Sequence, residues 1–315
     1  MAGDRPVTVV KIGGEIAVDA AAVCADVAAL AAAGRSVVLV HGGAAELDRL
    51  AARLGVPQRR LTTPKGSSSR YTDPATLEVL MLALAGKVKP ALLVELAGCG
   101  ASAVGLTGLD GGLLRARRTA VHRAVLDGRT KMIHDDHNGT IQLTDPTVLR
   151  VLLAAGIVPV VSPPALGLDG RPVNVDADRV AAAVADALGA AELVYLTGAP
   201  GLLRDPADET TVRESVELPA TGRMPAEAVG GMAAKLMAAR DALVAGVRSV
   251  RIADGRGTGP LRAALAGAGT TVRLAPAADQ EPGGGPGGAR ADGQDAAAVA
   301  AQAGGAATRS GERRG

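Results

Sequence analysis

Short apolar runs alternate with longer helical segments along most of this chain, and this alternation limits what it can fold into. Residues 7–10 are strand-like, residues 19–33 have a helical pattern that Gly34 ends, and residues 36–40 are strand-like again. A strand, a helix and a second strand in this order are typical of parallel β-sheets covered by helices. We therefore expect an α/β fold, with a mainly parallel open sheet between two helical layers in a three-layer αβα sandwich.

Start signals define further helices. Aspartate followed by proline begins a helix well, because aspartate caps the first turn and proline fits the first helical position. Such pairs stand at residues 73–74 and 145–146, and they predict helices from 73 toward 96 and from 145 to the glycine at 156. Further helices are expected at 177–188 and 232–245, and further strands at 157–161, 193–196, 249–253 and 270–273.

Composition restricts how the core is built and which partners are expected. The 315 residues include no phenylalanine or tryptophan and only two tyrosines, Tyr71 and Tyr195, so Val, Leu, Ile and Ala must fill the interior. The formal net charge of +2 and the scarcity of aromatic residues argue against nucleic-acid binding. The sequence contains no membrane-span or signal-peptide pattern, so we expect a cytoplasmic protein without a membrane partner. Cys24 and Cys99 lack metal-ligand spacing and are expected to be small buried thiols.

Two lysines beside glycine pairs indicate the chemistry of the site. Lys11 precedes Gly13 and Gly14, and Lys235 follows the glycine pair at 230–231. Phosphoryl transfer requires positive charge around the moving oxygens, which lysine and glycine-exposed backbone N–H groups supply. The segment Asn-Val-Asp-Ala-Asp at 174–178 could add a buried carboxylate that holds both ammonium groups. We therefore predict a phosphate-handling site.

A second glycine pair, Gly42 and Gly43, follows the strand expected at 36–40. Ligands of open α/β sheets bind at the carboxyl ends of the strands, where helices begin. Two neighbouring strands that end in glycine turns would form a cradle of backbone N–H groups for a phosphate chain. The motifs of P-loop, dinucleotide-binding and protein-kinase folds are absent, so another phosphate-handling fold is required.

Four motifs identify the family that the chain resembles. Val-Lys-Ile-Gly-Gly at 10–14, Val-His-Gly-Gly at 40–43, Asn-Val-Asp-Ala-Asp at 174–178 and Gly-Gly-Met-Ala-Ala-Lys at 230–235 resemble the amino acid kinase family in order and spacing. The resemblance spans residues 7–274. Within the family the chain is similar to the acetylglutamate kinases. Among these it most resembles the branch that acts on aminoadipate or glutamate attached to a small carrier protein, the LysW-aminoadipate kinases, on the segments 69–73, 105–111 and 135–140.

The resemblance implies a role for each motif residue. Lys11 and Lys235 would stabilise the transferring phosphoryl group, and Asp178 would orient both ammonium groups. Arg70 would bind the α-carboxylate of the substrate, because an arginine fork suits a carboxylate, and Asn174 would hold the amide-bearing end. For the substrate, the resemblance also implies binding by Gly42 and Gly43. For ATP it implies binding by the two lysines together with Gly13, Gly14, Thr197, Gly198, Gly201 and Leu202.

The implied reaction is attack of a side-chain carboxylate on the γ-phosphorus of ATP, with Mg²⁺ as cofactor, giving an acyl phosphate. A carboxylate is already a nucleophile at neutral pH, so no general base is expected and His41 is interpreted as structural. The resemblance also implies a substrate-binding and dimerisation lobe at about 1–165 and an ATP-binding lobe at about 166–274. No additional helix precedes the first strand, so a homodimer without arginine feedback is expected.

Three segments and one substituted residue fall outside this pattern. Residues 275–315 are rich in Gly, Ala and Pro and poor in large apolar side chains, so they are expected to be disordered. Ala44 replaces a glycine that acetylglutamate kinases commonly have, and residues 65–69 form the loop where substrate specificity would diverge. His-Asp-Asp-His at 134–137 is interpreted as a polar hairpin turn, and no metal held by protein side chains is expected.

The stretch 115–131 carries six basic residues against one acidic residue, and its interpretation separates the possible functions. It is either a solvated face or a docking surface for an acidic macromolecule. A kinase of carrier-linked substrates predicts docking through Lys65, Arg115, Arg117 and Arg118. The alternatives are an N-acetyl-L-glutamate 5-kinase of arginine synthesis, in which this stretch is only solvated, and a nucleotide-binding protein of the same fold without turnover.

Overall fold

The computed structural model describes residues 6–14, 17–62, 68–119, 121–225 and 228–276. These residues lie in one compact unit, residues 1–277. Lys65, most of the specificity loop at 65–69 and nearly all of the segment expected to be disordered, 275–315, lie outside the described residues. The division of the domain into two lobes at about residue 165 stays a prediction.

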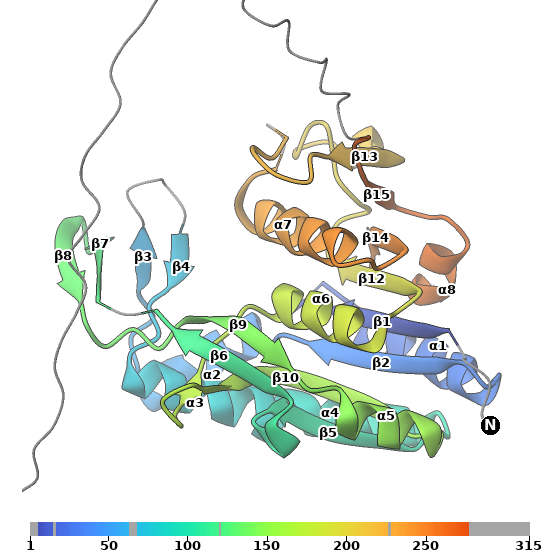
Figure 1. Cartoon of the computed structure of the whole chain (residues 1–315), viewed down its shortest axis with the longest axis horizontal. Coiled ribbons are helices and arrows are strands. Elements are labelled where there is room, and N and C mark those ends of the chain that lie inside the picture. The colour runs from blue at the N-terminus through green and yellow to red at the C-terminus, as the bar shows by residue number, and fades with distance from the viewer. Residues whose placement is uncertain (1–5, 15–16, 63–67, 120, 226–227, 277–315) are drawn as a thin grey trace, which may run out of the picture. The chain divides into compact units, whose positions relative to one another are not determined.

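A mixed, mainly parallel sheet forms the centre of this unit (Figure 1). Its strands are β1 (Val7–Ile12), β2 (Ser36–His41), β5 (Ala103–Gly108), β6 (Leu114–Arg118), β9 (Gly139–Thr144), β10 (Val158–Gly167), β11 (Pro172–Val173), β12 (Glu192–Thr197), β13 (Ser215–Leu218), β14 (Ser249–Asp254) and β15 (Thr270–Leu274). They lie in the order β13-β15-β14-β12-β1-β2-β10-β6-β9, with β5 and β11 also paired to β10. Strands β14, β12, β1, β2 and β10 are parallel, so their carboxyl ends meet at one edge.

Helices cover both faces of the sheet because its strands are apolar on both sides. Val9 and Val38 face a core that they share with α5 (Thr147–Ala154), α6 (Ala177–Leu188) and α7 (Gly230–Val244). Val10 and Leu39 face the opposite core, with α1 (Ala20–Ala32), α4 (Lys89–Gly98) and α8 (Pro260–Leu265). Figure 1 shows α6 and α7 on one side of β1 and β12. The predicted three-layer αβα sandwich is confirmed.

The helix predicted from residue 73 begins as expected. Asp73 caps α3 (Pro74–Ala83), where its carboxylate accepts the Thr76 N–H at 2.8 Å and Pro74 occupies the first turn. The helical segment then continues through a π-helical turn, Leu84–Val88, directly into α4. A wider π turn shifts the register of every later side chain, which the sequence pattern did not indicate.

A small antiparallel sheet stands beside the main one, in the order β4-β3-β7-β8. Its strands are β3 (Arg60–Thr62), β4 (Ser68–Arg70), β7 (His122–Leu126) and β8 (Arg129–Ile133). Leu61, Tyr71, Ala124, Leu126 and Ile133 form its core. These strands are short and largely polar, so the apolar runs used for the prediction did not reveal them.

Two expectations were wrong. Residues 134–137 do not form a hairpin turn, because they join β8 of the small sheet to β9 of the main sheet, where Asp136 accepts the backbone N–H of Thr72 at 3.1 Å. Cys24 is buried as expected, but Cys99 is exposed because it lies at the end of α4. Within the described residues, no helix is long and apolar enough to cross a membrane.

Candidate active site

Asp178 joins two lysines from different elements at the carboxyl edge of the sheet. Its carboxylate lies 2.7 Å from Lys11 Nζ, through Oδ1, and 3.1 and 3.0 Å from Lys235 Nζ, through Oδ1 and Oδ2. Lys11 comes from β1, Asp178 from the first turn of α6 and Lys235 from α7. The predicted meeting of the two ammonium groups on one carboxylate is therefore present, and we call this cluster the lysine–aspartate triad.

Burial makes the triad electrostatically strong. The side chains of Lys11, Asp178 and Lys235 are 8, 9 and 9% exposed. Burial alone would raise the pKa of Asp178, but the two ammonium groups outweigh it and hold this pKa below its ordinary value. Burial and the charge of Lys11 lower the pKa of Lys235, although Asp178 opposes this shift. The triad carries two positive charges and one negative charge, so it retains an attraction for an anion.

The local sequence explains why Asp178, and not Asp176, joins the lysines. Asp176 caps α6, and its carboxylate accepts the N–H groups of Asp178 at 2.9 Å and Arg179 at 3.1 Å. This cap places Asp178 in the first helical turn, on the face toward the sheet. Tyr195 of β12 lies below, and its buried hydroxyl donates to the Asp178 backbone oxygen at 3.1 Å. Its ring centroid lies 5.3 Å from Lys235 Nζ, which permits a cation–π contact.

The two predicted glycine turns meet. A Cβ atom on Gly14 would lie 2.6 Å from the backbone nitrogen of Gly43 and 2.7 Å from that of Ala44, where α2 (Ala44–Leu54) begins. A side chain at Gly14 would therefore collide with backbone. Gly13 is bound to β12, because its N–H donates to the Leu196 oxygen at 2.9 Å. The turns after β1 and β2 thus bring backbone N–H groups and a helix N-terminus to the same edge as the triad.

His41 is structural in its contacts, as the sequence interpretation held. Its Nδ1 donates to the Gly42 oxygen at 2.8 Å, and the ring is 1% exposed. Burial, together with the charges of Lys89 and Lys11, lowers the pKa of His41 to about 4, against the effect of the Gly42 bond. The imidazole is therefore neutral at pH 7 and fixes the carbonyl of the first glycine in the turn.

The segment expected under ATP follows β12. Thr197 ends this strand, and its backbone oxygen accepts the Gly255 N–H at 2.8 Å, which joins it to the turn after β14. Gly198 follows at the same edge. Gly201 has a positive φ and packs against Thr270, whose hydroxyl accepts the Leu202 N–H at 2.8 Å. Leu202 is 1% exposed, so in this structure it anchors the segment in the core.

The expected substrate residues Arg70 and Asn174 are joined through Asn138, which the sequence prediction had not singled out. Asn138 donates from Nδ2 to the Arg70 backbone oxygen at 2.6 Å and accepts from Asn174 Nδ2 at 2.8 Å. The guanidinium of Arg70 pairs with Asp48 of α2 at 2.6 Å. These contacts link the end of β4 to α2, which begins at Ala44. Only the topology brings the four residues together, because they are far apart in sequence.

The expected docking residues differ in their surroundings. Arg118 uses its guanidinium for the loop before β9, donating to the His134 oxygen at 2.6 Å and the Asp136 oxygen at 2.9 Å. Arg117 is exposed on β6, and Arg115 is half-buried. The basic stretch is also divided, because Arg123, Arg129 and Lys131 lie on β7 and β8 of the small sheet. Among the three arginines of β6, Arg117 is thus the one best placed to contact an external partner.

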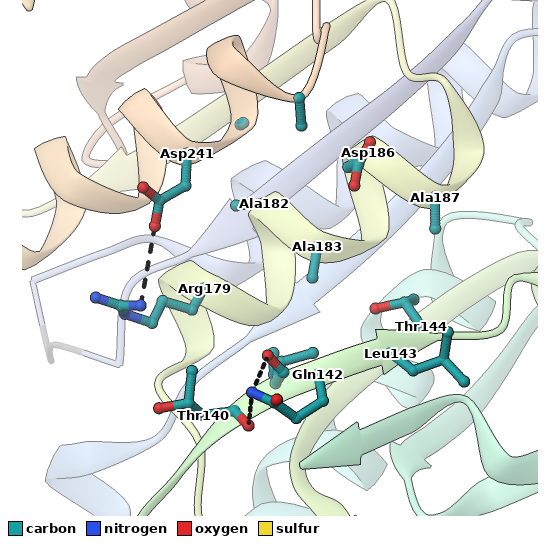
Figure 2. A pocket seen from close by; sticks show the side chains of 13 residues that line it. Thr140, Gln142, Leu143, Thr144, Arg179, Ala182, Ala183, Asp186, Ala187 and Asp241 are labelled. Atoms are coloured by element: carbon teal, nitrogen blue, oxygen red, sulfur yellow. Dashed lines mark hydrogen bonds and ion pairs between the residues drawn. The ribbon is translucent and has the colours of Figure 1, made fainter. Parts of the chain in front are cut away.

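A groove of about 430 Å³ lies elsewhere, between α6, α7 and β9 (Figure 2). Alanines of both helices form much of its lining, and Arg179 and Asp241 make an ion pair of 3.8 Å at one side. No residue of the lysine–aspartate triad lines it. The groove is therefore separate from the candidate active site.

A comparison with family models decides the identity of this arrangement. The model described as the amino acid kinase family matches residues 6–254. The chain belongs to the amino acid kinase family. The resemblance of the four motifs is therefore confirmed, and the chain is an enzyme of the phosphotransferase class that uses ATP.

Relatives narrow the position of the chain within the amino acid kinase family. It is 42% identical to a LysW-aminoadipate kinase of Thermus thermophilus over 84% of this chain and 99% of the relative. It is 40% identical to a LysW-aminoadipate kinase of Deinococcus radiodurans, over 84% and 90% of the two chains. An acetylglutamate kinase of Symbiobacterium thermophilum is 37% identical over 79% of this chain and 84% of that enzyme.

Solved structures agree with the family. N-acetylglutamate synthase from Neisseria gonorrhoeae, in complex with coenzyme A and N-acetyl-glutamate, has a TM-score of 0.66 at 29% identity. The match covers 86% of this chain and 60% of the synthase, so the chain spans less than two thirds of that protein. Carbamate kinase from Giardia, at 13% identity and a TM-score of 0.58 over 86% of this chain and 99% of that chain, shares the fold.

Proposed function

We propose that this enzyme phosphorylates the side-chain carboxylate of aminoadipate or glutamate whose amino group is attached to a small acidic carrier protein. The observation that carries the phosphoryl-transfer part is the lysine–aspartate triad beside the two glycine turns. The carrier-linked substrate is supported by relatives named LysW-aminoadipate kinase at 40 and 42% identity. The acceptor would be part of lysine or arginine synthesis, and such a reaction suits a cytoplasmic enzyme.

In the proposed reaction, an oxygen of the acceptor carboxylate attacks the γ-phosphorus of ATP. The new P–O bond forms as the bond to the β-phosphate oxygen breaks, and the electron pair leaves with ADP. Lys11 and Lys235 stabilise the charge on the transferring group and on the leaving phosphate. Mg²⁺ enters with ATP, since this ion is commonly held by substrate phosphates and water.

Asp178 has a positioning role. Without a carboxylate between them, two buried ammonium groups would repel each other and move apart. A shared carboxylate holds both at fixed distances before the nucleotide binds, so little reorganisation is needed during transfer. The acceptor carboxylate is already ionised, and the neutral His41 is bound to Gly42, so the mechanism requires no general base.

The acceptor end is proposed to lie near Arg70 and Asn174. The fork of Arg70 would exchange Asp48, its partner at 2.6 Å, for the α-carboxylate of the substrate. Asn174, which is fixed by Asn138, would hold the amide that links the amino acid to the carrier. The carrier itself would contact the basic residues of β6.

Acyl phosphate trapping as a hydroxamate tests the function directly. Purified enzyme receives Mg-ATP with a carrier protein bearing aminoadipate, a carrier bearing glutamate, or free N-acetyl-L-glutamate. We expect turnover with a loaded carrier. Turnover only with free N-acetylglutamate would assign the alternative, an acetylglutamate kinase, which the 37% identical relative supports. ATP binding without any product would favour a non-catalytic nucleotide-binding protein.

Charge reversal at Arg117 tests the docking surface. This side chain is exposed on β6, so Arg117→Glu should raise KM for the loaded carrier about tenfold and leave KM for ATP unchanged. Arg248→Glu is the matched control, because this exposed arginine precedes β14, which four strands separate from β6 in the sheet order. Equal KM values for the carrier in both variants would refute docking at β6. Arg118 is unsuitable for this test, because it holds the loop before β9.

The oligomeric state is part of the proposal. We expect a homodimer, as implied by the resemblance to acetylglutamate kinases. Light scattering after size-exclusion chromatography measures the mass directly, and twice the monomer mass of 31.2 kDa is the expected result.

A further inference from the structure

Lys89 is a buried lysine that the lysine–aspartate triad does not use. It begins α4 and is 5% exposed. Its Nζ donates to the Leu106 backbone oxygen of β5 at 2.6 Å. Among the described residues no carboxylate forms an ion pair with it, and the charge of Asp110 acts on it only from a greater distance. Buried charges are normally paired, so this ammonium group requires an explanation.

The sequence provides a slot for this side chain. The π-helical turn Leu84–Val88 precedes Lys89 and sets the direction in which it leaves the helix. Gly105 of β5 leaves space for its stem, because a Cβ there would lie 2.6 Å from Lys89 Cδ and 3.0 Å from Cγ. The lysine therefore crosses a glycine to reach the end of β5. This neighbourhood is specific for a long, thin side chain.

The π-helical turn that precedes Lys89 packs against the second glycine turn. A Cβ on Gly43 would lie 2.5 Å from Leu84 Cδ2 and 3.1 Å from Val88 Cγ2, so the π-helical turn packs directly against the Gly42–Gly43 turn. His41, which precedes the turn, is affected by the charge of Lys89. Leu106 pairs with Val161 of β10, which in turn pairs with Val40 of β2. Lys89 Nζ, bonded to Leu106, thus lies level with the last residues of β2, with β10 between β5 and β2.

We propose that Lys89 is a positioning residue whose buried charge favours binding of the anionic acceptor at the Gly42–Gly43 turn. The inference rests on the proposed function, because it assumes that this turn receives the acceptor carboxylate. A hydrogen bond to a carbonyl could be made by a neutral side chain such as glutamine. A buried ammonium group without a carboxylate partner is instead suited to a site that an anion enters during the reaction.

Two substitutions separate the charge from the hydrogen bond. Lys89→Met removes both, whereas Lys89→Gln removes the charge and keeps a donor for Leu106. We expect both variants to raise KM for the loaded carrier about tenfold, with kcat changed less than about threefold and KM for ATP unchanged. Lys87→Met is the matched control, because Lys87 belongs to the same π-helical turn but is 53% exposed and pairs loosely with Glu46 at 3.7 Å. It should leave every constant unchanged.

The outcomes are distinct. A wild-type KM for the loaded carrier in Lys89→Gln would overturn the inference, since the hydrogen bond alone would then suffice. Equal increases in KM for the loaded carrier and for ATP would also overturn it. If Lys89→Met fails to fold, Lys89→Gln still decides between charge and hydrogen bond. Failure of the wild-type enzyme with every acceptor would refute the proposed function and this inference with it. Normal wild-type turnover together with unchanged Lys89 variants would refute the inference alone.

Discussion

Asp178 is the residue on which the candidate active site depends. Asp178→Asn leaves two buried ammonium groups without a counter-charge, so kcat should fall about 100- to 1000-fold and the free energy of unfolding by about 3–5 kcal/mol. Hydroxamate production and urea denaturation measure the two effects. Asp241→Asn is the control, because this exposed carboxylate of α7 pairs only at 3.8 Å with Arg179 of α6. Wild-type kcat in Asp178→Asn would remove this residue from the mechanism.

Tyr195 supports the triad from below, and its two contacts can be separated. Tyr195→Phe keeps the ring beneath Lys235 but removes the hydroxyl bonded to the Asp178 backbone oxygen. We expect a loss of about 1–2 kcal/mol in unfolding free energy and a fall in kcat below tenfold. Tyr195→Leu should cost more in both measurements, because it also removes the ring. If both variants have the same kcat, the ring contact with Lys235 has no role in transfer.

The triad was foreseeable at the residue scale, and its neighbours were not. Lysines beside glycine pairs and an aspartate-rich segment between them have recognisable local patterns, which is why Lys11, Lys235 and a carboxylate within residues 174–178 were predicted. The resemblance to the amino acid kinases then singled out Asp178. Asn138 has no such pattern. Its importance comes from bonds to Arg70 and Asn174, residues 68 and 36 positions away. Lys89 was missed for a related reason, since its burial depends on a π-helical turn and on Gly105 of another strand.

At the scale of elements, a side chain of α1 caps the N-terminus of α8. Gly259 precedes α8 and has no side chain that could cap this helix. Asp26 of α1 instead accepts the N–H groups of Leu261 at 2.9 Å and Arg262 at 3.1 Å. The same carboxylate pairs with the Arg262 side chain at 2.7 Å and is 3% exposed. Helix α8 is thus attached to α1, although the two helices are far apart in sequence.

Removing this carboxylate should destabilise the protein without changing its chemistry. Asp26→Ala leaves two N–H groups at the start of α8 without an acceptor, so the free energy of unfolding should fall by about 2–3 kcal/mol. Asp26→Asn keeps one acceptor oxygen and should lose less. Asp186→Ala, at an exposed position of α6, should change stability by less than about 0.5 kcal/mol. An Asp26→Ala protein as stable as this control would contradict the capping role.

Which elements could be predicted follows from how they are buried. Strands β1, β2, β12 and β14 lie between two helical layers, so they are continuous apolar runs and were found. Strands β3, β4, β7 and β8 pack only around a small core and contain serine, arginine and lysine, so their sequences resemble loops. The hairpin expected at 134–137 failed for the same reason, because the small sheet that those residues leave was not predicted.

At the scale of the whole molecule, His41 makes stability depend on pH. Its pKa is lowered from 6.5 to about 4 in the folded protein, mainly by burial, so between these values the unfolded chain binds a proton that the folded chain does not. Stability must therefore fall as the pH decreases from about 6.5 to about 4. The stabilisation from the neutral His41 is fully present above pH 6.5, and about 2–3 kcal/mol of unfolding free energy is lost as the pH falls from 6.5 to 4.

Urea denaturation of wild type and His41→Asn at intervals between pH 7 and pH 4 measures this contribution. Asparagine can still donate to the Gly42 oxygen, but it is smaller than the buried ring, so the variant should be less stable than wild type at pH 7. Because asparagine does not titrate in this range, the variant should lose less stability on acidification. His134→Asn, at an exposed position, should keep the wild-type dependence. Parallel curves for wild type and His41→Asn would mean that the ring charges without cost. The turn at Gly42 would then be far more open to water than the structure has it.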